Sequence, residues 1–234
     1  MPVPPHRTPE DTIVMRKAFH EELDRVAETL VEMTHLASSA MSRATTALLD
    51  ADIHLADSVI AADAEIDARR AELDLMSFDL LARQQPVATD LRVIVTSMRM
   101  SSDIERMGDL ARHVAKLARL RYPASPIPAQ LHSTILEMGQ VAERVVAKTG
   151  SVIAGRDLVM ASELEQDDDQ MDRLHRELFT VLLDPNWDGG VEAAVDVTLC
   201  GRFYERFADH AVSVARRVTF LVTGERPPVP HHAS

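Results

Sequence analysis

Apolar residues recur at steps of three and four along most of this chain, which is the spacing of one face of an α-helix. The pattern is interrupted at Pro86, at the run YPASPIP (122–128), at Gly155 and at the run PNWDGG (185–190). Such residues end helices or form turns. The two longest stretches each need an internal turn, near 50–52 and near 155–157, the second of which serves as a helix N-cap. The pattern predicts six helices, roughly 10–50, 52–85, 87–121, 127–154, 157–184 and 190–223.

The sequence also repeats itself. The run IERMGDLA (104–111) returns as YERFADHA (204–211), and DAEIDARRAEL (63–73) returns as DDQMDRLHREL (168–178). The two offsets, 100 and 105, differ only across the turns at Pro86 and Pro185, where changes of length are tolerated. We therefore predict an all-α fold of two tandem three-helix bundles, with six antiparallel helices. The expected domains are 10–122 and 127–223, and the proline-rich ends, 1–9 and 225–234, are expected to be disordered.

Composition agrees with helices, because 4% aromatic residues and eight glycines accompany 46% hydrophobic residues. The single cysteine provides no disulfide framework and fits a reducing compartment. No segment has the pattern of a signal peptide or is apolar for long enough to span a membrane, so we expect a cytoplasmic protein without membrane insertion. The formal charge of -12 argues against nucleic acid as a partner and leaves cations, or a basic face of another protein.

Acidic residues form pairs at i, i+4 spacing in both repeats. Four residues make about one helical turn, so the two carboxylates of a pair project from one face and repel each other by roughly 0.2–0.5 kcal/mol. In the third and sixth predicted helices the pairs continue an apolar stripe that begins at Leu91 and at Val191, so we expect them to turn toward a neighbouring helix, where a carboxylate needs a partner. The pairs are Asp63/Asp67, Glu105/Asp109, Asp168/Asp172 and Glu205/Asp209.

Two interpretations of these pairs remain open. If the second and third helices of a repeat are antiparallel, four carboxylates surround one volume, and such hard oxygen ligands suit Mg, Mn, Ca or Fe and can accept Zn. Alternatively, the acids form salt bridges that fix helix register, with partners among Arg70, Arg99, Arg106, Arg202 and Arg206. The spacing alone does not decide between them.

Other candidate chemistry is weaker. His113 could join the first acidic group, but its repeat counterpart is Ser213. The pairs Glu32/His35 and Asp172/His175 have the i, i+3 spacing of di-iron bundles, yet they fall at unmatched positions in the repeats. No serine–histidine–acid set, phosphate-binding glycine loop or HExxH motif is present. The sequence therefore favours a protein that is not an enzyme.

Three strings resemble the PhoU family of phosphate-transport accessory proteins: PVATDLR (86–92), DIERMGDLARHVA (103–115) and YERFADHAVSVA (204–215). The resemblance covers residues 12 to 222. It implies two three-helix bundles in which the four acidic pairs bind metal clusters, with divalent or trivalent ions such as Fe, Mn, Mg or Zn. The second repeat departs from the family pattern, because Ala208 replaces a glycine and the P-x-A-x-D-L-R block is missing.

The same resemblance implies a role. Proteins of this family help to hold the Pho response off when phosphate is plentiful, by linking the ATPase subunit of the phosphate ABC transporter to a sensor histidine kinase. It also implies a homodimer. Two alternatives remain beside this negative regulator: a ferritin-like, carboxylate-bridged metalloenzyme, and a helical adaptor without metal.

Overall fold

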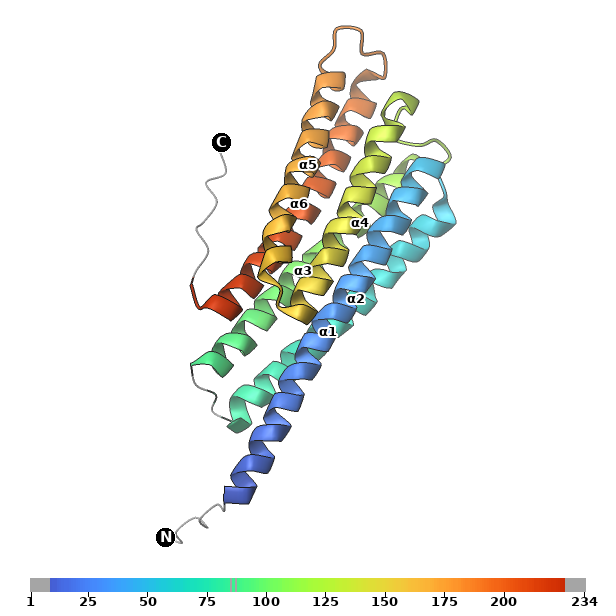
Figure 1. Ribbon diagram of the computed structural model, residues 1–234. Coiled ribbons are helices and arrows are strands. Elements are labelled where there is room, and N and C mark those ends of the chain that lie inside the picture. Colours follow the sequence, from blue (N-terminus) through green and yellow to red (C-terminus); the bar gives the residue numbers. More distant parts are fainter. Residues whose placement is uncertain (1–8, 85, 87, 226–234) are drawn as a thin grey trace.

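The computed structural model describes residues 9–84, 86 and 88–225, and within them every long element is an α-helix (Figure 1). The described residues contain no β-strand, and no helix among them is long and apolar enough to cross a membrane. The predicted all-α fold is confirmed. The elements are α1 (Pro9–Asp50), α2 (Ile53–Gln84), α3 (Thr89–Arg121), the 3-10 helix η1 (Ala129–Leu131), α4 (His132–Gly155), α5 (Leu158–Leu182) and α6 (Gly190–Thr223).

Most helix boundaries lie within two residues of the predicted ones, and the exception is the start of α4. Residue 127 was expected to open this helix, but η1 comes first and α4 begins at His132. Three prolines lie between 123 and 128. The helical conformation is unfavourable for a residue that precedes proline, so the helix begins only after the last of them. The predicted N-cap of α5 is confirmed, because the Asp157 side chain accepts hydrogen bonds from the backbone N–H groups of Val159 and Met160. The predictions for residues 1–8 and 226–234 lie outside the described residues.

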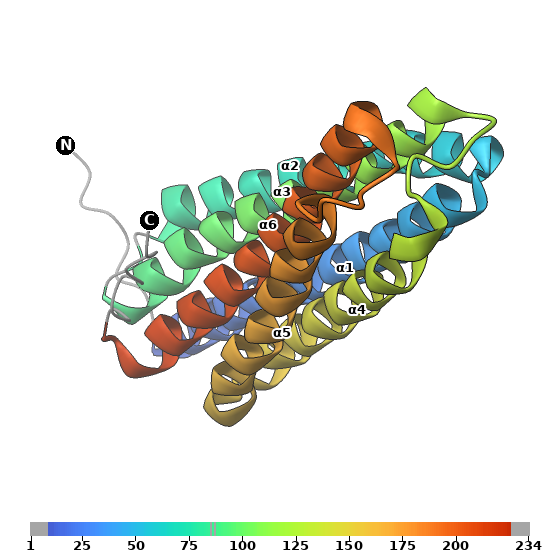
Figure 2. The same cartoon turned by 90° about the horizontal axis from the view of Figure 1, so that it is seen from above.

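The helices form two layers (Figures 1 and 2). In the first, contacts run in the order α2–α3–α6–α5. In the second, α1 and α4 pack against each other and cover one side of the first layer, α1 against α2 and α3, α4 against α5 and α6. Consecutive helices run antiparallel, so each repeat is the three-helix bundle that the sequence predicted.

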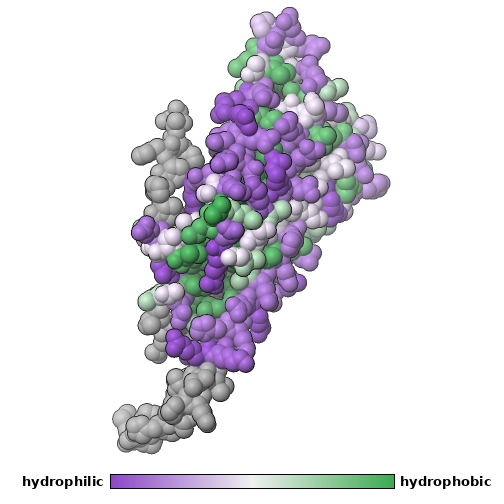
Figure 3. Space-filling view, in the orientation of Figure 1, coloured by the Kyte–Doolittle hydropathy of each residue, from purple (hydrophilic) through white to green (hydrophobic). Residues whose placement is uncertain are grey.

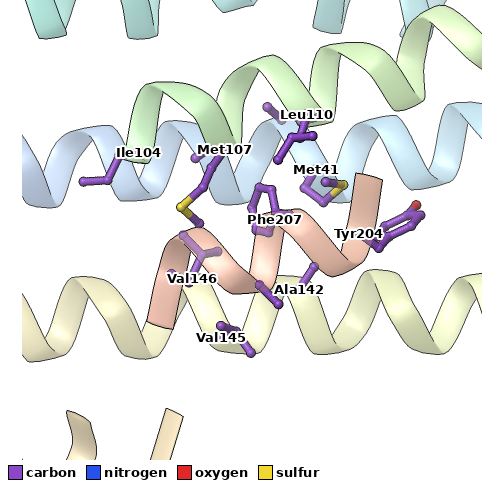
Figure 4. Close-up of a cluster of buried hydrophobic side chains, with 14 of the residues drawn as sticks. Met41, Ile104, Met107, Leu110, Ala142, Val145, Val146, Tyr204 and Phe207 are labelled. Carbon is purple, nitrogen blue, oxygen red and sulfur yellow. The ribbon is translucent and has the colours of Figure 1, made fainter. Parts of the chain in front are cut away.

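The two bundles share one hydrophobic core. Figure 4 shows Phe207 of α6 beside Met107 of α3, with Met41 of α1 and Val146 of α4 from the second layer around it. Burial of one such side chain contributes about 1.5–3 kcal/mol to folding. All six α-helices contribute residues to this single cluster. The division of the chain into two domains between residues 122 and 127 therefore stays a prediction.

The α1–α4 contact is close because two glycines of α4 lie against two threonines of α1. A Cβ atom at Gly139 would lie 2.7 Å from Cγ2 of Thr45, and one at Gly150 would lie 2.7 Å from Oγ1 of Thr34. Thr45 also shares a 2.7 Å hydrogen bond with the hydroxyl of the fully buried Tyr204 on α6. Small residues therefore decide how near the two repeats approach each other.

The apolar stripe on which the acids of α3 and α6 lie is exposed where it begins. Leu91 and Val191, and the next residues, Val95 and Val195, are all exposed. The core faces of these helices lie elsewhere, for example at Ile104 and Tyr204. Spacing at three and four shows only that residues share a face. The tertiary contacts decide which part of a face is buried, and the start of this face stays at the surface.

Candidate functional site

The acidic pairs of the first repeat meet between α2 and α3, as the antiparallel arrangement predicts. Arg112 of α3 contacts both helices, because its guanidinium lies 3.0 Å from Oδ2 of Asp63 and also pairs with Asp109. Burial raises the pKa of Asp63; Arg112 opposes this effect, and the nearby carboxylates of Asp67 and Asp109 add to it. We call Asp63, Asp67, Glu105 and Asp109 the first carboxylate cluster.

Arginines neutralise much of the first carboxylate cluster. Nη1 of Arg70 lies 3.1 Å from Oε2 of Glu105, and Nη1 of Arg106 lies 3.0 Å from Oδ2 of Asp109. The pKa of Glu105 is nevertheless raised, chiefly by burial, although Arg70 favours its charged form. Arg70 and Arg106 were expected partners, whereas Arg112 was missed, although its i, i+3 spacing from Asp109 was a visible signal.

The second repeat gathers its acids in the same way. The raised pKa of Glu205 is caused first by burial and then by the nearby Asp209, with Asp172 also contributing. The pKa of Asp168 is raised to about 7, first by burial and then by the nearby carboxylates of Asp209 and Asp172. We call Asp168, Asp172, Glu205 and Asp209 the second carboxylate cluster.

Few basic side chains lie near the second carboxylate cluster. Arg202 pairs with Glu205. Among the described residues, Asp168, Asp172 and Asp209 have no lysine, arginine or histidine nitrogen within 4.0 Å. Arg216 lowers the pKa of Asp168 only partly, and its guanidinium pairs with Glu165 at 2.9 Å. The second cluster therefore carries more unneutralised negative charge than the first.

The repeat explains this difference. At the offsets of 105 and 100, His175 stands in the place of Arg70, and Val212 stands in the place of Arg112. His175 does not replace the missing charge, because burial lowers its pKa and its ring packs against Phe179 with the centroids 5.1 Å apart. The expected partners Arg99 and Arg206 form no ion pair with either cluster in the described part of the chain.

The family glycine at 108 has a packing role in this structure. A Cβ atom there would lie 2.7 Å from Cδ1 of Ile66 and 3.3 Å from Oδ1 of Asp63, so glycine lets α2 approach α3. In the second repeat Ala208 is fully buried at the corresponding position. The alanine does not prevent the acids of α5 and α6 from gathering, since the pKa values of Asp168 and Glu205 both respond to the neighbouring helix.

The chemistry of the second cluster fits a hard cation. Its donors are carboxylate oxygens, and Asp168, Asp172 and Asp209 have no cationic neighbour in the described part of the chain, so a divalent ion held by these three would remove repulsion without displacing an arginine. The side chains are gathered without being closed around a point, because no group of three or more histidine, cysteine or acidic residues forms a ready-made metal site in residues 9–84, 86 and 88–225.

The remaining candidates have other contacts. The ring of His113 packs against Phe203 of α6, with centroids 5.3 Å apart, and burial lowers its pKa. Glu32 lies 3.6 Å from Nε of Arg69 on α2, so its carboxylate has a basic partner. Cys200 is fully buried, and burial raises the pKa of its thiol, so it has no reactive character.

Sequence reasoning missed the polar contacts between the repeats, of which Asp103 makes two. Asp103 of α3 accepts a 2.7 Å hydrogen bond from Nε of Arg217, and its other oxygen lies 3.1 Å from Nδ1 of His210. Both partners belong to α6. The signal was absent because neither spacing nor repeat matching reveals which helices of different repeats become neighbours.

Comparisons with known proteins agree with this arrangement. The family model described as PhoU domain matches residues 30–118 and 135–218. The chain is 51% identical over 213 residues to the phosphate-specific transport system accessory protein PhoU homolog 2 of Mycobacterium tuberculosis, covering 91% of this chain and 100% of the relative. It is 29% identical over 215 residues to the PhoU homolog of Rhizobium meliloti, covering 90% and 89% of the two chains.

Solved structures give the same result. PhoU from Pseudomonas aeruginosa has a TM-score of 0.77 and 30% identity, covering 88% of this chain and 100% of that one. The phosphate transport system regulatory protein PhoU from Streptococcus pneumoniae has a TM-score of 0.78 and 25% identity, covering 90% and 100%. With the doubled domain match and the matched carboxylate clusters, these likenesses show that the chain belongs to the PhoU family.

Proposed function

We propose that this chain is an accessory protein of phosphate uptake that holds the Pho response off when phosphate is plentiful. It does so without catalysis, by linking the ATPase subunit of a phosphate ABC transporter to a sensor histidine kinase. The printed names of its relatives support the association with phosphate-specific transport. The absence of catalysis is supported by the sequence, which contains no serine–histidine–acid set, phosphate-binding glycine loop or HExxH motif.

Metal binding is the second part of the proposal, and one observation carries it. The same four-carboxylate arrangement occurs in both repeats, yet among the described residues arginines pair with three acids of the first cluster and with only one of the second. Asp168, Asp172, Glu205 and Asp209 are the residues that would hold a divalent or trivalent ion such as Mg, Mn, Fe or Zn. The ion would supply charge neutralisation between α5 and α6. The first carboxylate cluster is a weaker site, because an ion must compete there with Arg70, Arg106 and Arg112.

The regulatory part is tested by deleting the gene. Expression of phosphate-starvation genes in phosphate-rich medium is expected to rise in the deletion strain and to return to normal when the wild-type chain is supplied. Unchanged expression in a strain that has no second copy contradicts the proposed role. Pull-down from phosphate-replete cells, with and without chelator, then tests whether transporter and kinase are the partners.

The metal part is tested on protein purified without chelator or affinity metal. Elemental analysis is expected to find bound metal in the wild type and about half as much or less in Asp168→Asn/Asp209→Asn. Asp169→Asn is the matched control, because Asp169 neighbours the cluster and is exposed. If no metal is found, and Mn, Mg, Zn and Fe leave the melting temperature unchanged, the metal-free adaptor is the correct description. Oxygen consumption by iron-loaded protein would instead indicate the ferritin-like enzyme.

A homodimer also belongs to the proposal and rests on family resemblance. Sedimentation at several protein concentrations is expected to give twice the chain mass of 25.9 kDa. A sedimenting mass that stays at one chain throughout would remove this part and leave the regulatory part standing.

A further inference from the structure

Large apolar residues are exposed at matching positions of the two repeats. In the first repeat they are Phe78, Leu91 and Val95, with 56%, 42% and 38% of each residue exposed. In the second they are Leu183, Val191 and Val195, with 79%, 82% and 50% exposed. We call these sets the first and second apolar strips. Each residue of one strip corresponds to a residue of the other at the repeat offset of 105 or 100.

A single exposed apolar residue needs no explanation, but a matched set does. The repeats differ at many buried and charged positions, for example Arg70 against His175 and Arg112 against Val212. They nevertheless both keep large apolar side chains at three positions that the core does not use. By contrast Val159, which is 70% exposed, corresponds to His54 at the repeat offset. The exposed apolar residues of the strips thus occur in both repeats, whereas Val159 is an exposed apolar residue of the second repeat alone.

The two strips have equivalent places in the fold. The first lies where the end of α2 meets the start of α3, and the second lies where the end of α5 meets the start of α6. These two junctions are at opposite ends of the molecule in Figure 1, and Figure 3 shows hydrophobic residues at the surface near the upper one. On α3 and α6 each strip shares a helix face with the acids of its repeat.

The second strip borders a groove between α5 and α6. This groove has a volume of about 650 Å³ and is lined by Phe179, Leu183, Trp187, Val191, Val195 and Leu199. A volume of that size accommodates several apolar side chains. An amphipathic helix that lays its apolar face into such a groove is a common mode of protein recognition.

Acidic residues are sequence neighbours of both strips. Asp184, Asp188 and Glu192 border the second one, and the first two of these have no basic partner among the described residues. Asp74, Asp79 and Asp90 are close to the first in the sequence, and of these only Asp79 has a basic partner in the described part of the chain, Arg83 at 2.6 Å. The rims therefore favour an occupant that carries lysine or arginine beside its apolar face.

The same charge excludes two other occupants. A second copy of this chain would bring one acidic rim against another, which costs free energy. An anionic membrane surface would be repelled for the same reason. We propose that each apolar strip binds an amphipathic helix of a partner protein, with an apolar face and flanking basic residues. One chain thereby takes two copies of the same segment, independently of the carboxylate clusters.

The test uses a synthetic helical peptide of about 18 residues, roughly five turns, with leucines along one face and lysines at both ends. Titration calorimetry on the full chain in the presence of chelator is expected to give two peptides per chain. The control peptide keeps the leucines and carries glutamates at its ends. It is expected to bind at least about tenfold more weakly, a difference of about 1.4 kcal/mol.

Variants locate the two sites. Leu91→Asp and Val191→Asp are each expected to leave one peptide per chain, and the double variant none. Val159→Asp is the matched control and is expected to keep two, since Val159 is exposed to a similar degree outside both strips. Because all three positions are exposed, the circular dichroism spectra are expected to stay unchanged.

Several results would overturn the inference. These are a single site in the wild type, two sites in the double variant, equal binding of the glutamate peptide, or binding of phosphatidylglycerol vesicles that the double variant loses. Loss of self-association in the double variant would instead assign the strips to a contact between copies. Asp168→Asn/Asp209→Asn is expected to bind the peptide like the wild type, so failure of the metal proposal would leave this one intact.

Discussion

Arg121, the last residue of α3, donates a 2.6 Å hydrogen bond from Nε to Oδ2 of Asp196 on α6, and its Nη2 lies 3.1 Å from Oδ1 of the same carboxylate. Asp196 is buried, and Arg121 also pairs with Glu192. This two-point contact joins the end of the first repeat to the last helix of the second. The two repeats are thus joined by a buried ion pair as well as by their shared hydrophobic core.

Replacement of Arg121 by methionine is expected to lower the free energy of unfolding by about 3 kcal/mol, because Asp196 then stays buried without its cation. Urea unfolding measures the loss. Arg119→Met is the matched control on the same helix, where the pair with Asp57 is exposed and worth about 0–1 kcal/mol. Equal losses in the two variants would contradict the importance of the buried carboxylate.

Glycine at 139 is expected to be required for the close α1–α4 contact. Gly139→Ala places a Cβ atom 2.7 Å from Thr45, and the overlap is expected to cost about 1–3 kcal/mol of stability. Gly155→Ala is the control, because no atom lies within 4 Å of a Cβ there. Thermal melts of both variants decide the matter: the first is expected to melt several degrees lower and the second at or above the wild-type temperature.

Asp168 makes the metal-free protein sensitive to pH. Its pKa is about 7 in the folded chain and 3.8 in the unfolded one, so between these values the folded state binds the extra proton. Stability therefore falls as pH rises from about 4 to 7 and stays low above it. Asp168→Asn removes this dependence and is expected to be more stable than the wild type by about 2 kcal/mol at pH 8 with chelator. Urea unfolding at pH 5 and pH 8 measures it, and an equal pH dependence in both proteins would contradict the prediction.

The first carboxylate cluster is expected to become metal-dependent when Arg112 is replaced by valine, the residue at the equivalent position 212. Without metal, Arg112→Val is expected to lose about 2–4 kcal/mol, because Asp63 is buried and loses its cation. Added Mn²⁺ is expected to restore more stability than in the wild type. Arg99→Val is the control on the same helix, since Arg99 is exposed and, among the described residues, forms no ion pair with either cluster. A Mn²⁺ effect no larger than in the wild type would speak against the first cluster as a latent site.

Much of the site was visible in the sequence, and its charge balance was not. The i, i+4 pairs and their repetition indicate which acids gather, and the structure brings Asp63 beside Asp109 and Asp168 beside Asp209. Whether arginine reaches them depends on side chains from the neighbouring helix. Arg70 of α2 reaches Glu105 of α3, and no helical period encodes that contact. Salt bridges between described residues thus engage Asp63, Glu105 and Asp109 in the first cluster but only Glu205 in the second, a difference that spacing could not foresee.

By itself the sequence determined the six helices, the N-cap at Asp157 and the doubling of the chain, because periodicity, capping and turn chemistry are local. The tertiary structure alone decided which helix faces are buried. It turned Leu91 and Val191 outward, joined Arg121 to Asp196, and left the second carboxylate cluster short of positive charge. The physical reason is that burial and ion pairing depend on which elements become neighbours in space, and residues separated by 75 or 100 positions carry no local signal of that contact.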